Sequence, residues 1–325
     1  MCNTPSFWYK TKSYISYILL PLAFLYSLIV YIRNKFTIPK KARIPVICIG
    51  NIIAGGAGKT PVAIAIAKAL LAHNIKVAFV TRGYKGNTIC STKVDLSCHT
   101  ASHVGDEALL LAKIAPVYIN KDRYNAIETA VNHGIELVIM DDGLQNPTIY
   151  KDIKVLVIDG LHGIGNGYLI PAGPLRETLV SALKKIDYVI IIGDDKNSFT
   201  SKVPINIPVI KASVEITNNL ELKDKKFLAF TGIGLPNKFF NTLTKNGAQI
   251  ILRKIFPDHY QYTTNDLYTL KKLAKTCNAD LITTEKDIVR LKPDDQKHII
   301  IVPIETKLGE IFIDMLIKHI KKLLP

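Results

Sequence analysis

The stretch GNIIAGGAGKTP, from Gly50 to Pro61, is a glycine-rich loop between an apolar run and a helical run. Glycines in this context let backbone N–H groups turn toward phosphate oxygens, and the N-terminus of the next helix adds positive potential. The pattern G-x-x-x-x-G-K-[ST] would place its first glycine at residue 53, which is Ile53. Gly55 and Gly56 therefore supply the bend. A phosphate-binding loop of this kind follows a strand and opens a helix, so we expect a strand before it and a helix after it.

We predict that this loop binds a nucleotide. Lys59 can bridge the β and γ phosphates, which makes it a predicted catalytic residue, and the Thr60 hydroxyl can coordinate Mg²⁺. The predicted nucleotide-binding residues are Ile53, Ala54, Gly55, Gly56, Ala57, Gly58, Lys59 and Thr60.

A second motif, ELVIMDDGLQN, ends an apolar run with Asp141 and Asp142. Carboxylates at the end of a strand hold Mg²⁺ or its waters in many phosphate-transferring proteins. Two aspartates before a glycine also favour a turn, so the motif alone leaves both interpretations open. Given the phosphate-binding loop, we predict that Asp141 and Asp142 are metal ligands together with Thr60.

Short β-type runs alternate with helical runs along the chain, which predicts a parallel sheet covered by helices. In the first part we expect strands at 44–50, 76–81, 115–120, 135–142, 153–160 and 187–194, with helices at 60–72, 106–115 and 123–134. A shorter set begins near residue 220, with strands at 225–234, 249–256 and 280–285 and helices at 235–247 and 265–277.

The predicted fold class is α/β: a P-loop NTPase-type parallel sheet flanked by helices, with a second smaller α/β domain and an N-terminal membrane-associated helix. The segment 197–208 is poor in helix signals and is the expected edge of the first domain. The predicted domains are residues 1–40, the helix with its basic flank; 41–218, the P-loop domain; and 219–325, a smaller domain that closes the cleft.

The basic residues are unevenly distributed. Residues 1–94 contain thirteen Lys or Arg and no acidic residue, whereas residues 95–325 contain twenty-nine basic and twenty-seven acidic residues. The basic excess flanks an apolar run. We therefore expect an anionic membrane surface as a partner, and no nucleic acid.

That apolar run, residues 14–32, has nineteen consecutive uncharged residues. As a helix it would be about 28 Å long, close to the hydrocarbon core of about 30 Å. Pro21 lies within it, and no small-x-small signal-peptidase site follows it. A helix that spans the membrane and one that lies in the interface both remain open. Four tyrosines of the type that prefers the headgroup boundary lie along the run: Tyr14, Tyr17, Tyr26 and Tyr31.

Basic residues after the run outnumber those before it, which predicts that the body of the protein is cytoplasmic. The cysteines are odd in number and form no C-x-x-C pair, which favours reduced thiols. The spacing of Cys98, His99 and His103 matches no common zinc pattern.

The order of the motifs resembles the tetraacyldisaccharide 4'-kinase family of lipid A synthesis. The similarity runs from FWY (7–9) through GNIIAGGAGKTP, TRGYKG, GDEALLLA, DDGLQN, VIDG, GNGYLIPAGPLRE, GIGLPNKFF, FPDHY and TTEKD, which covers almost the whole chain. The loop of that family has the same bunched glycines. Thr81 and Lys85 depart from the family, in which Ser and Gly are more frequent.

The resemblance implies a kinase that uses ATP and Mg²⁺ to phosphorylate the 4'-hydroxyl of tetraacyldisaccharide 1-phosphate. It also implies a location at the cytoplasmic face of the bacterial inner membrane, with attachment through the N-terminal helix. An acylated, anionic lipid substrate agrees with the basic and apolar N-terminus. No obligate protein partner is evident from the sequence.

Transfer to a sugar hydroxyl needs a group that orients and deprotonates it. The resemblance implies that Asp106 is the catalytic base, that Glu107 is an acid of the metal site, and that His259 is the partner of Asp106 from the second domain. At an expected helix start, Asp106 also has the position of a cap. Because Asp ordinarily titrates near 3.9 and His near 6.5, we expect the two to act as a unit.

The resemblance further implies that Arg176, Glu177 and Gln145 contact the substrate, with Arg suited to bidentate phosphate binding. Lys286 and Asp287 are predicted site residues without an assigned role. Two other classes remain: a membrane-attached P-loop switch that hydrolyses ATP or GTP without modifying a lipid, and a membrane-anchored structural module. The switch requires fewer acidic motifs than this chain has. The sequence gives no indication of acyl-chain selectivity or oligomeric state.

Overall fold

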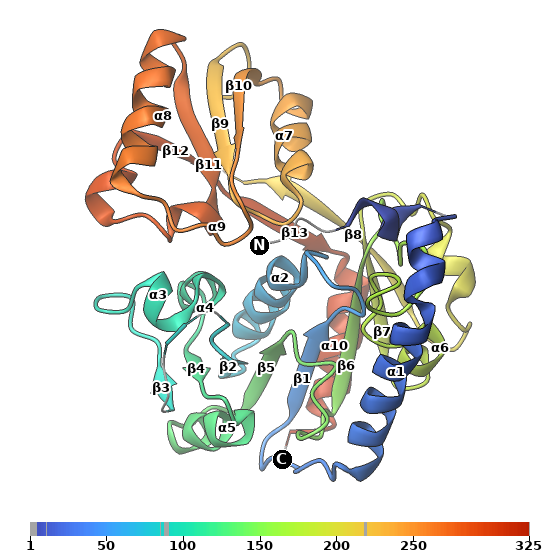
Figure 1. The fold of residues 1–325 in the computed structure, drawn as a ribbon. Coiled ribbons are helices and arrows are strands. Elements are labelled where there is room, and N and C mark those ends of the chain that lie inside the picture. Colours follow the sequence, from blue (N-terminus) through green and yellow to red (C-terminus); the bar gives the residue numbers. More distant parts are fainter. Residues whose placement is uncertain (1–4, 11, 85, 88–90, 218–219, 325) are drawn as a thin grey trace.

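The computed structural model of the protein describes residues 5–10, 12–84, 86–87, 91–217 and 220–324. Cys2, Lys85, Cys90 and the expected domain boundary at 218–219 lie outside these residues. The described chain forms a larger unit around a nine-stranded sheet and a smaller unit around a four-stranded sheet, which lies above the larger one in Figure 1. The predicted α/β class with a second, smaller unit is confirmed.

Thirteen strands are present in the described residues. In chain order they are β1 (Val46–Gly50), β2 (Val77–Thr81), β3 (Thr92–Lys93), β4 (Val117–Ile119), β5 (Leu137–Asp141), β6 (Ile153–Asp159), β7 (Tyr188–Ile192), β8 (Val209–Ile216), β9 (Lys226–Thr231), β10 (Gln249–Ile255), β11 (Asp280–Thr284), β12 (Ile299–Val302) and β13 (Ile304–Leu308). The larger sheet has the order β13-β8-β7-β6-β1-β5-β2-β4-β3, and the smaller sheet has the order β10-β9-β11-β12.

Helices cover both sheets. They are α1 (Tyr14–Phe36), α2 (Lys59–Ala72), α3 (Ala101–Val104), α4 (Asp106–Ala112), α5 (Arg123–Asn132), α6 (Leu179–Leu183), α7 (Pro236–Lys245), α8 (Thr264–Thr276), α9 (Glu285–Ile288) and α10 (Glu310–Lys321), with 3₁₀ turns η1 (Ser6–Tyr9), η2 (Phe199–Lys202) and η3 (Pro293–Gln296). In the larger unit α2, α4 and α10 pack on one face and α5 and α6 on the other. In the smaller unit α7 covers one face, and α8 and α9 cover the other.

Strand β1 lies in the middle of the larger sheet, with β5 and β6 as parallel neighbours. All five residues of β1 and of β5 are buried, as expected for parallel strands covered on both faces. Because neighbouring parallel strands end at the same edge of a sheet, the loop after β1 and the aspartates at the end of β5 come out side by side.

The expected extension of the smaller domain to residue 325 is wrong. Strand β13 pairs antiparallel with β8 in the larger sheet, with Thr306 opposite Val214. Helix α10 buries an apolar face, including Phe312 and Leu316, in the core of the larger unit. The segment 197–208 is not the edge of the larger unit either, because β8 follows it in the same sheet. The chain therefore enters the smaller unit after β8 and returns with β13.

Helix α1 is long and apolar enough to cross a membrane by length and composition. One side of it nevertheless lies against the larger unit (Figure 1). The hydroxyl of Tyr26 donates to the carbonyl oxygen of Arg176 at 3.0 Å, and Nη2 of Arg33 donates to that of Gln145 at 2.9 Å. Near the start of the helix Ser16 is buried. Tyr26, expected at the headgroup boundary, therefore faces the body of the protein.

Candidate active site

The loop after β1 bends at its glycines. Gly55 has φ of 124° and Gly58 has φ of 78°, a region that glycine adopts without steric cost. A Cβ atom on Gly58 would lie 2.5 Å from Cδ1 of Ile192, so the Ile192 side chain would have to shift to admit one. Gly58 is the N-cap of α2, and Lys59 is the first helical residue. The loop therefore leads directly into a helix N-terminus, where anions bind.

Ile53 occupies the position where the common loop pattern has glycine. Its side chain is 2% exposed, and its backbone forms an antiparallel bridge with Leu175. The neighbouring Ala54 N–H donates to the carbonyl oxygen of Pro174 at 2.8 Å. Ala57 is also buried. The side chains of Ile53 and Ala57 thus anchor the loop in the core, and the glycines between them make its bend.

Asp141 lies at the end of β5 with Oδ2 accepting a 2.8 Å hydrogen bond from the Thr60 hydroxyl. Its side chain is buried, and Oδ1 has no hydrogen-bond partner. Burial, followed by the negative charge of Glu107, raises the pKa of Asp141 to about 7. The structure thus brings together Thr60, Asp141 and Glu107, three of the four predicted metal ligands, around a buried carboxylate oxygen that has no hydrogen-bond partner among the described residues.

Asp142, the fourth predicted ligand, has a different environment. Its backbone has φ of 55°. Its carboxylate lies 3.6 Å from Nζ of Lys59 and accepts from Nη1 of Arg176 at 3.1 and 3.2 Å. Burial opposes ionisation, but the charges of Lys59 and Arg176 outweigh it and lower the pKa of Asp142. Arg123 donates to the Asp142 carbonyl oxygen at 3.2 Å. Asp142 is therefore held as an anion by cations of the protein.

The predicted substrate-binding residues lie beside this cluster. Nε2 of Gln145 donates to the carbonyl oxygen of Asn51 at 2.9 Å and to Glu177 at 3.1 Å. Its Oε1 lies 3.4 Å from Nη1 of Arg176. Glu177 is buried and forms a 2.6 Å ion pair with Lys185. Gln145 and Glu177 thus hold the segment that carries Arg176 against the phosphate-binding loop.

Asp106 and His259 come from different units and meet in the structure. Asp106 begins α4 in the larger unit, and His259 follows β10 in the smaller one. Nδ1 of His259 lies 2.8 Å and 3.0 Å from the two carboxylate oxygens of Asp106. The backbone of His259 has φ of 61°, and its N–H donates to the Gly232 carbonyl oxygen at 3.0 Å. The predicted pair is therefore present, 153 residues apart in sequence.

Arg290, which was not predicted from the sequence, also contacts Asp106. Its Nε and Nη2 donate to Oδ2 of Asp106 at 2.8 and 2.6 Å, and its Nη1 donates to Asp287 at 3.0 Å. Burial favours protonated Asp106, but the hydrogen bond from His259 and the charges of Lys286 and Arg290 outweigh it and hold the pKa of Asp106 well below its usual range. An arginine three residues after Asp287 was the available signal.

Lys286 connects the two clusters. Its Nζ lies 3.1 Å from Oε1 of Glu107 and 3.4 Å from Nε2 of His259. Burial opposes its charged form, but the carboxylates of Glu107 and Asp106 outweigh this and raise the pKa of Lys286. A series of contacts thus leads from Glu107, whose charge acts on Asp141, to the His259 pair. Lys286, left without a role by the sequence, lies in the middle of it.

Asp287 is held by hydrogen bonds within the smaller unit. Its carboxylate accepts hydrogen bonds from the hydroxyl groups of Thr231, Tyr262 and Thr284 and from the Gly232 N–H, at 2.6 to 2.8 Å. It is fully buried. Asp287 therefore joins the ends of β9 and β11 at the interface between the two units.

A further ion pair between the units was also not predicted from the sequence. Lys238 in α7 pairs with Asp159, which lies at the end of β6. Asp159 is fully buried and also accepts from Nδ1 of His162 at 2.9 Å. The two units are therefore joined by ion pairs on both sides of the phosphate-binding loop.

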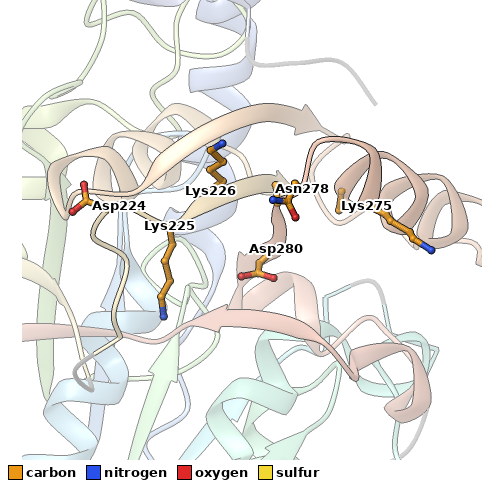
Figure 2. A pocket seen from close by; sticks show the side chains of 8 residues that line it. Asp224, Lys225, Lys226, Lys275, Asn278 and Asp280 are labelled. Atoms are coloured by element: carbon orange, nitrogen blue, oxygen red, sulfur yellow. The ribbon is translucent and has the colours of Figure 1, made fainter.

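A cavity of about 490 Å³ in the smaller unit lies away from this site. Lys226 and Asp280, which begin β9 and β11, line it together with Lys225 and Lys275 (Figure 2). The opposite ends of these two strands are Thr231 in β9 and Thr284 in β11, and both of these residues contact Asp287. The cavity is therefore separate from the cluster between the units.

Known proteins are similar to this chain over most of its length. The sequence model of the family described as tetraacyldisaccharide-1-P 4'-kinase matches residues 15–321. A tetraacyldisaccharide 4'-kinase from Paramagnetospirillum magneticum is 40% identical over 304 residues, which cover 93% of each chain. One from Parvibaculum lavamentivorans is 42% identical over 294 residues, which cover 88% of this chain and 86% of that protein.

A solved structure is also similar. The crystal structure of LpxK from Aquifex aeolicus in complex with ATP superimposes with a TM-score of 0.77 and 25% identity, covering 96% of this chain and all of that one. The family match extends over the loop, both carboxylate clusters and the returning C-terminal helix. This chain belongs to the tetraacyldisaccharide-1-P 4'-kinase family.

Proposed function

We propose that the protein transfers the γ-phosphoryl group of ATP to the 4'-hydroxyl of tetraacyldisaccharide 1-phosphate. The observation that carries this proposal is that the Thr60–Asp141 contact at the phosphate-binding loop lies under the charge of Glu107, which is connected through Lys286 to the pair formed by Asp106 and His259. This supports one site, built by both units, that holds the proposed phosphate-binding groups and the proposed proton-accepting pair. A nucleotide switch has no use for the second half of that site, so the kinase is favoured over the switch.

Nucleotide binding is assigned to the loop 53–60. Its backbone amides and the N-terminus of α2 would contact the phosphates, and Lys59 would bridge the β and γ phosphates. In the structure, Nζ of Lys59 lies 3.6 Å from the carboxylate of Asp142. Part of that pairing would be exchanged for phosphate contacts when ATP binds.

The residues around Asp141 fit Mg²⁺. Oδ1 of Asp141 is buried without a partner, and the nearby carboxylate of Glu107 raises the pKa of Asp141, so a cation would relieve both. Among the described residues no group of three or more His, Cys, Asp or Glu side chains surrounds a common metal position. This agrees with Mg²⁺, which usually keeps waters and takes one or two carboxylates besides phosphate oxygens. We assign Thr60, Asp141 and Glu107 to it, with Asp142 nearby; bound Mg²⁺ neutralises phosphate charge.

Asp106 and His259 are assigned to the substrate hydroxyl. The O–H bond of the 4'-hydroxyl breaks, its proton passes to the pair, and its oxygen forms a bond to the γ phosphorus. The bond from that phosphorus to the bridging oxygen breaks, and ADP leaves. Arg176 is assigned to the anionic substrate, and Gln145 and Glu177 support it through the contacts described above.

Helix α1 is assigned to the cytoplasmic surface of the inner membrane, where it would lie in the interface. Its hydrogen bonds to the larger unit occur near its start at Ser16 and further along at Tyr26 and Arg33, so most of the helix stays beside the body. Its outer side exposes Ile18, Leu25 and Ile29, among other apolar residues. An apolar side with basic residues near its end is typical of interfacial helices.

Transfer of label from γ-labelled ATP to purified acylated disaccharide 1-phosphate tests the reaction. We expect lipid phosphorylation that requires Mg²⁺, with one ADP released for each lipid phosphorylated. Hydrolysis of ATP that is independent of the lipid would support the switch instead, and the absence of any turnover would support a structural module.

Binding to vesicles tests the membrane assignment. Replacing Ile18, Leu25 and Ile29 by Ser should reduce binding to vesicles that contain anionic lipid, because three outward apolar side chains are lost. Ile251→Ser, at an exposed isoleucine of the smaller unit, is the matched control and should bind like the parent. Unchanged binding of the triple variant would contradict the interfacial helix.

A further inference from the structure

Asp159, at the end of β6, is held by the turn that follows it. Its Oδ1 accepts from the backbone N–H groups of Leu161 and His162 at 3.0 and 2.9 Å, and it lies 2.9 Å from Nδ1 of His162. The side chain of Asp159 is 1% exposed, and its other oxygen, Oδ2, forms the ion pair with Lys238 of the smaller unit. The larger unit therefore presents one carboxylate oxygen, oriented by its own turn, to Lys238.

Lys238 lies in the first turn of α7, directly after the segment that faces the phosphate-binding loop. A Cβ atom on Gly234 would lie 3.8 Å from the backbone nitrogen of Gly56, so little space separates the two backbones. The N–H of Gly56 is among the groups assigned to phosphate. The ion pair between Lys238 and Asp159 therefore helps to fix how closely the start of α7 covers the loop.

The N-terminal segment docks on the loop that follows Asp159. Nε1 of Trp8 in η1 donates to the carbonyl oxygen of Pro171 at 3.0 Å, and the carbonyl oxygen of Trp8 accepts from the N–H of Asn166 at 2.7 Å. The side-chain nitrogen of Asn166 also lies 3.0 Å from the hydroxyl oxygen of Ser16 in α1. Both η1 and the start of α1 are thus fixed to this loop.

Tyr9, the last residue of η1, packs against His162. The centroids of the two rings are 5.3 Å apart and the rings are inclined at 66°, an edge-to-face arrangement that favours one relative orientation. The same imidazole contacts Asp159 through Nδ1. Continuous contacts therefore lead from η1 through His162 and Asp159 to Lys238, and none of these residues is assigned to the nucleotide, to Mg²⁺ or to the substrate hydroxyl.

We infer that Lys238 is a positioning residue for ATP binding, and that Tyr9 and His162 couple its ion pair with Asp159 to the docked N-terminal segment. The pair stabilises the arrangement in which the smaller unit covers the phosphate-binding loop. Because ATP would contact both units in that arrangement, its apparent affinity rises with the fraction of molecules that are closed. This inference rests on the proposed assignment of the loop to ATP.

Calorimetric titration with ATP in the absence of lipid tests the positioning role. Lys238→Met should raise the dissociation constant for ATP roughly 3- to 10-fold, since one partner of the lost pair is buried and the other is partly exposed. Lys238→Arg keeps the charge and should restore most of the affinity. Lys245→Met, at an exposed lysine in the last turn of α7, is the matched control and should bind ATP like the parent.

Steady-state kinetics should show the same separation. At saturating ATP the nucleotide itself closes the protein, so Lys238→Met should raise KM for ATP and leave kcat near the parental value. Parental affinity for ATP in Lys238→Met, or a loss of kcat without a change in KM for ATP, would overturn the positioning role.

A double-variant cycle tests the coupling to the N-terminal segment. Tyr9→Ala should raise the dissociation constant for ATP by a smaller factor, roughly 2- to 5-fold, because an aromatic contact is lost. In the Lys238→Met background it should have little further effect, because it acts through the same ion pair. Tyr14→Ala, at an exposed tyrosine of α1, is the control. Factors that multiply in the double variant would overturn the coupling.

Hydrogen exchange of the protein without ATP supplies a readout that depends on neither nucleotide nor turnover. We expect backbone amides of 53–58 and 232–238 to exchange faster in Lys238→Met and in Tyr9→Ala, and those of α10 to stay unchanged. Unchanged exchange in both segments would overturn the inference even if ATP affinity falls. If the parent binds ATP but phosphorylates no lipid, the kinase proposal fails and this inference stands, whereas parental ATP affinity in Lys238→Met leaves the kinase proposal intact.

Discussion

Asp141 and Asp106 are both nearly buried, 4% and 5% exposed, yet the protein shifts their pKa values in opposite directions. At Asp141, burial and the charge of Glu107 raise the pKa to about 7. At Asp106, the hydrogen bond from His259 and the cations Lys286 and Arg290 outweigh burial and lower it. The comparison teaches that burial alone does not decide the charge of a carboxylate; the neighbouring groups do.

The two carboxylates also differ in the hydrogen-bond partners of their oxygens. Oδ1 of Asp141 has no partner from the described residues, whereas the oxygens of Asp106 are filled by side chains of the smaller unit. We therefore propose that a cation and a nucleotide complete the Asp141 side of the site. The Asp106 side depends on the contact between the two units.

The largest effect is expected from the Asp106 side. Asp106→Ala and His259→Ala should each lower kcat by about 10² to 10⁴, the usual contribution of a positioned general base, while the dissociation constant for ATP stays near the parental value. The double variant should be little worse than the more damaging single one. Rapid-quench measurement of lipid phosphorylation checks this. Losses that multiply would show that the two residues work independently.

A smaller effect, in binding and not mainly in turnover, is expected from the nucleotide side. Lys59→Ala removes a charge-assisted contact worth about 1.5 to 3 kcal/mol, which is roughly a 10- to 150-fold weaker affinity for ATP. Calorimetric titration with ATP measures it. Lys68→Ala, on the same helix but paired with Glu305, is the control. Parental affinity in Lys59→Ala would remove the assignment of the loop to ATP.

The smallest effects, on thermal stability, should have opposite signs at the two aspartates. Because the pKa of Asp141 is raised, the folded state holds a proton between pH about 4 and about 7 that the unfolded state has lost. The free energy of unfolding therefore falls as pH rises through this range. The destabilisation by Asp141 is fully present above pH about 7. Asp141→Asn should therefore raise Tm at pH 8 without Mg²⁺, by about 2 to 4 °C for each kcal/mol gained.

Asp106 should respond in the other direction. Its lowered pKa contributes stability above the pKa of an unfolded aspartate, and this is lost as pH falls through the folded value. Asp106→Asn should therefore lower Tm at pH 8, because it also removes one of the two carboxylates that pair with the buried Arg290. Calorimetric scans at pH 5 and pH 8 compare the variants. Shifts of the same sign at pH 8 would break the contrast between the two sites.

Local features of this protein were readable from the sequence. The expected strand-loop-helix at residues 44–72 corresponds to β1 and α2, and the expected strand with Asp141 at its end corresponds to β5. These elements depend on hydrophobic periodicity and glycine geometry over a few residues. The pairing of Asp106 with His259 came only from resemblance to the family, since nothing local connects residues 153 positions apart.

Contacts between distant segments could not be predicted. Arg290 and Lys238 were not singled out from the sequence, because their partners Asp106 and Asp159 lie on the other unit. The return of β13 and α10 to the larger sheet was missed because an amphipathic helix is equally suited to either unit by its pattern.

The sequence by itself determined the phosphate-binding loop, the carboxylates at the end of β5, the α/β class and the basic, apolar N-terminus, because each is written in neighbouring residues. Only the tertiary structure decided that Asp106 is paired with cations of the protein, whereas an oxygen of Asp141 has no partner among the described residues. It also decided that the chain returns to the larger unit with β13 and α10. The physical reason is that charge interactions and side-chain packing act through space, and the sequence order does not contain the distances on which they depend.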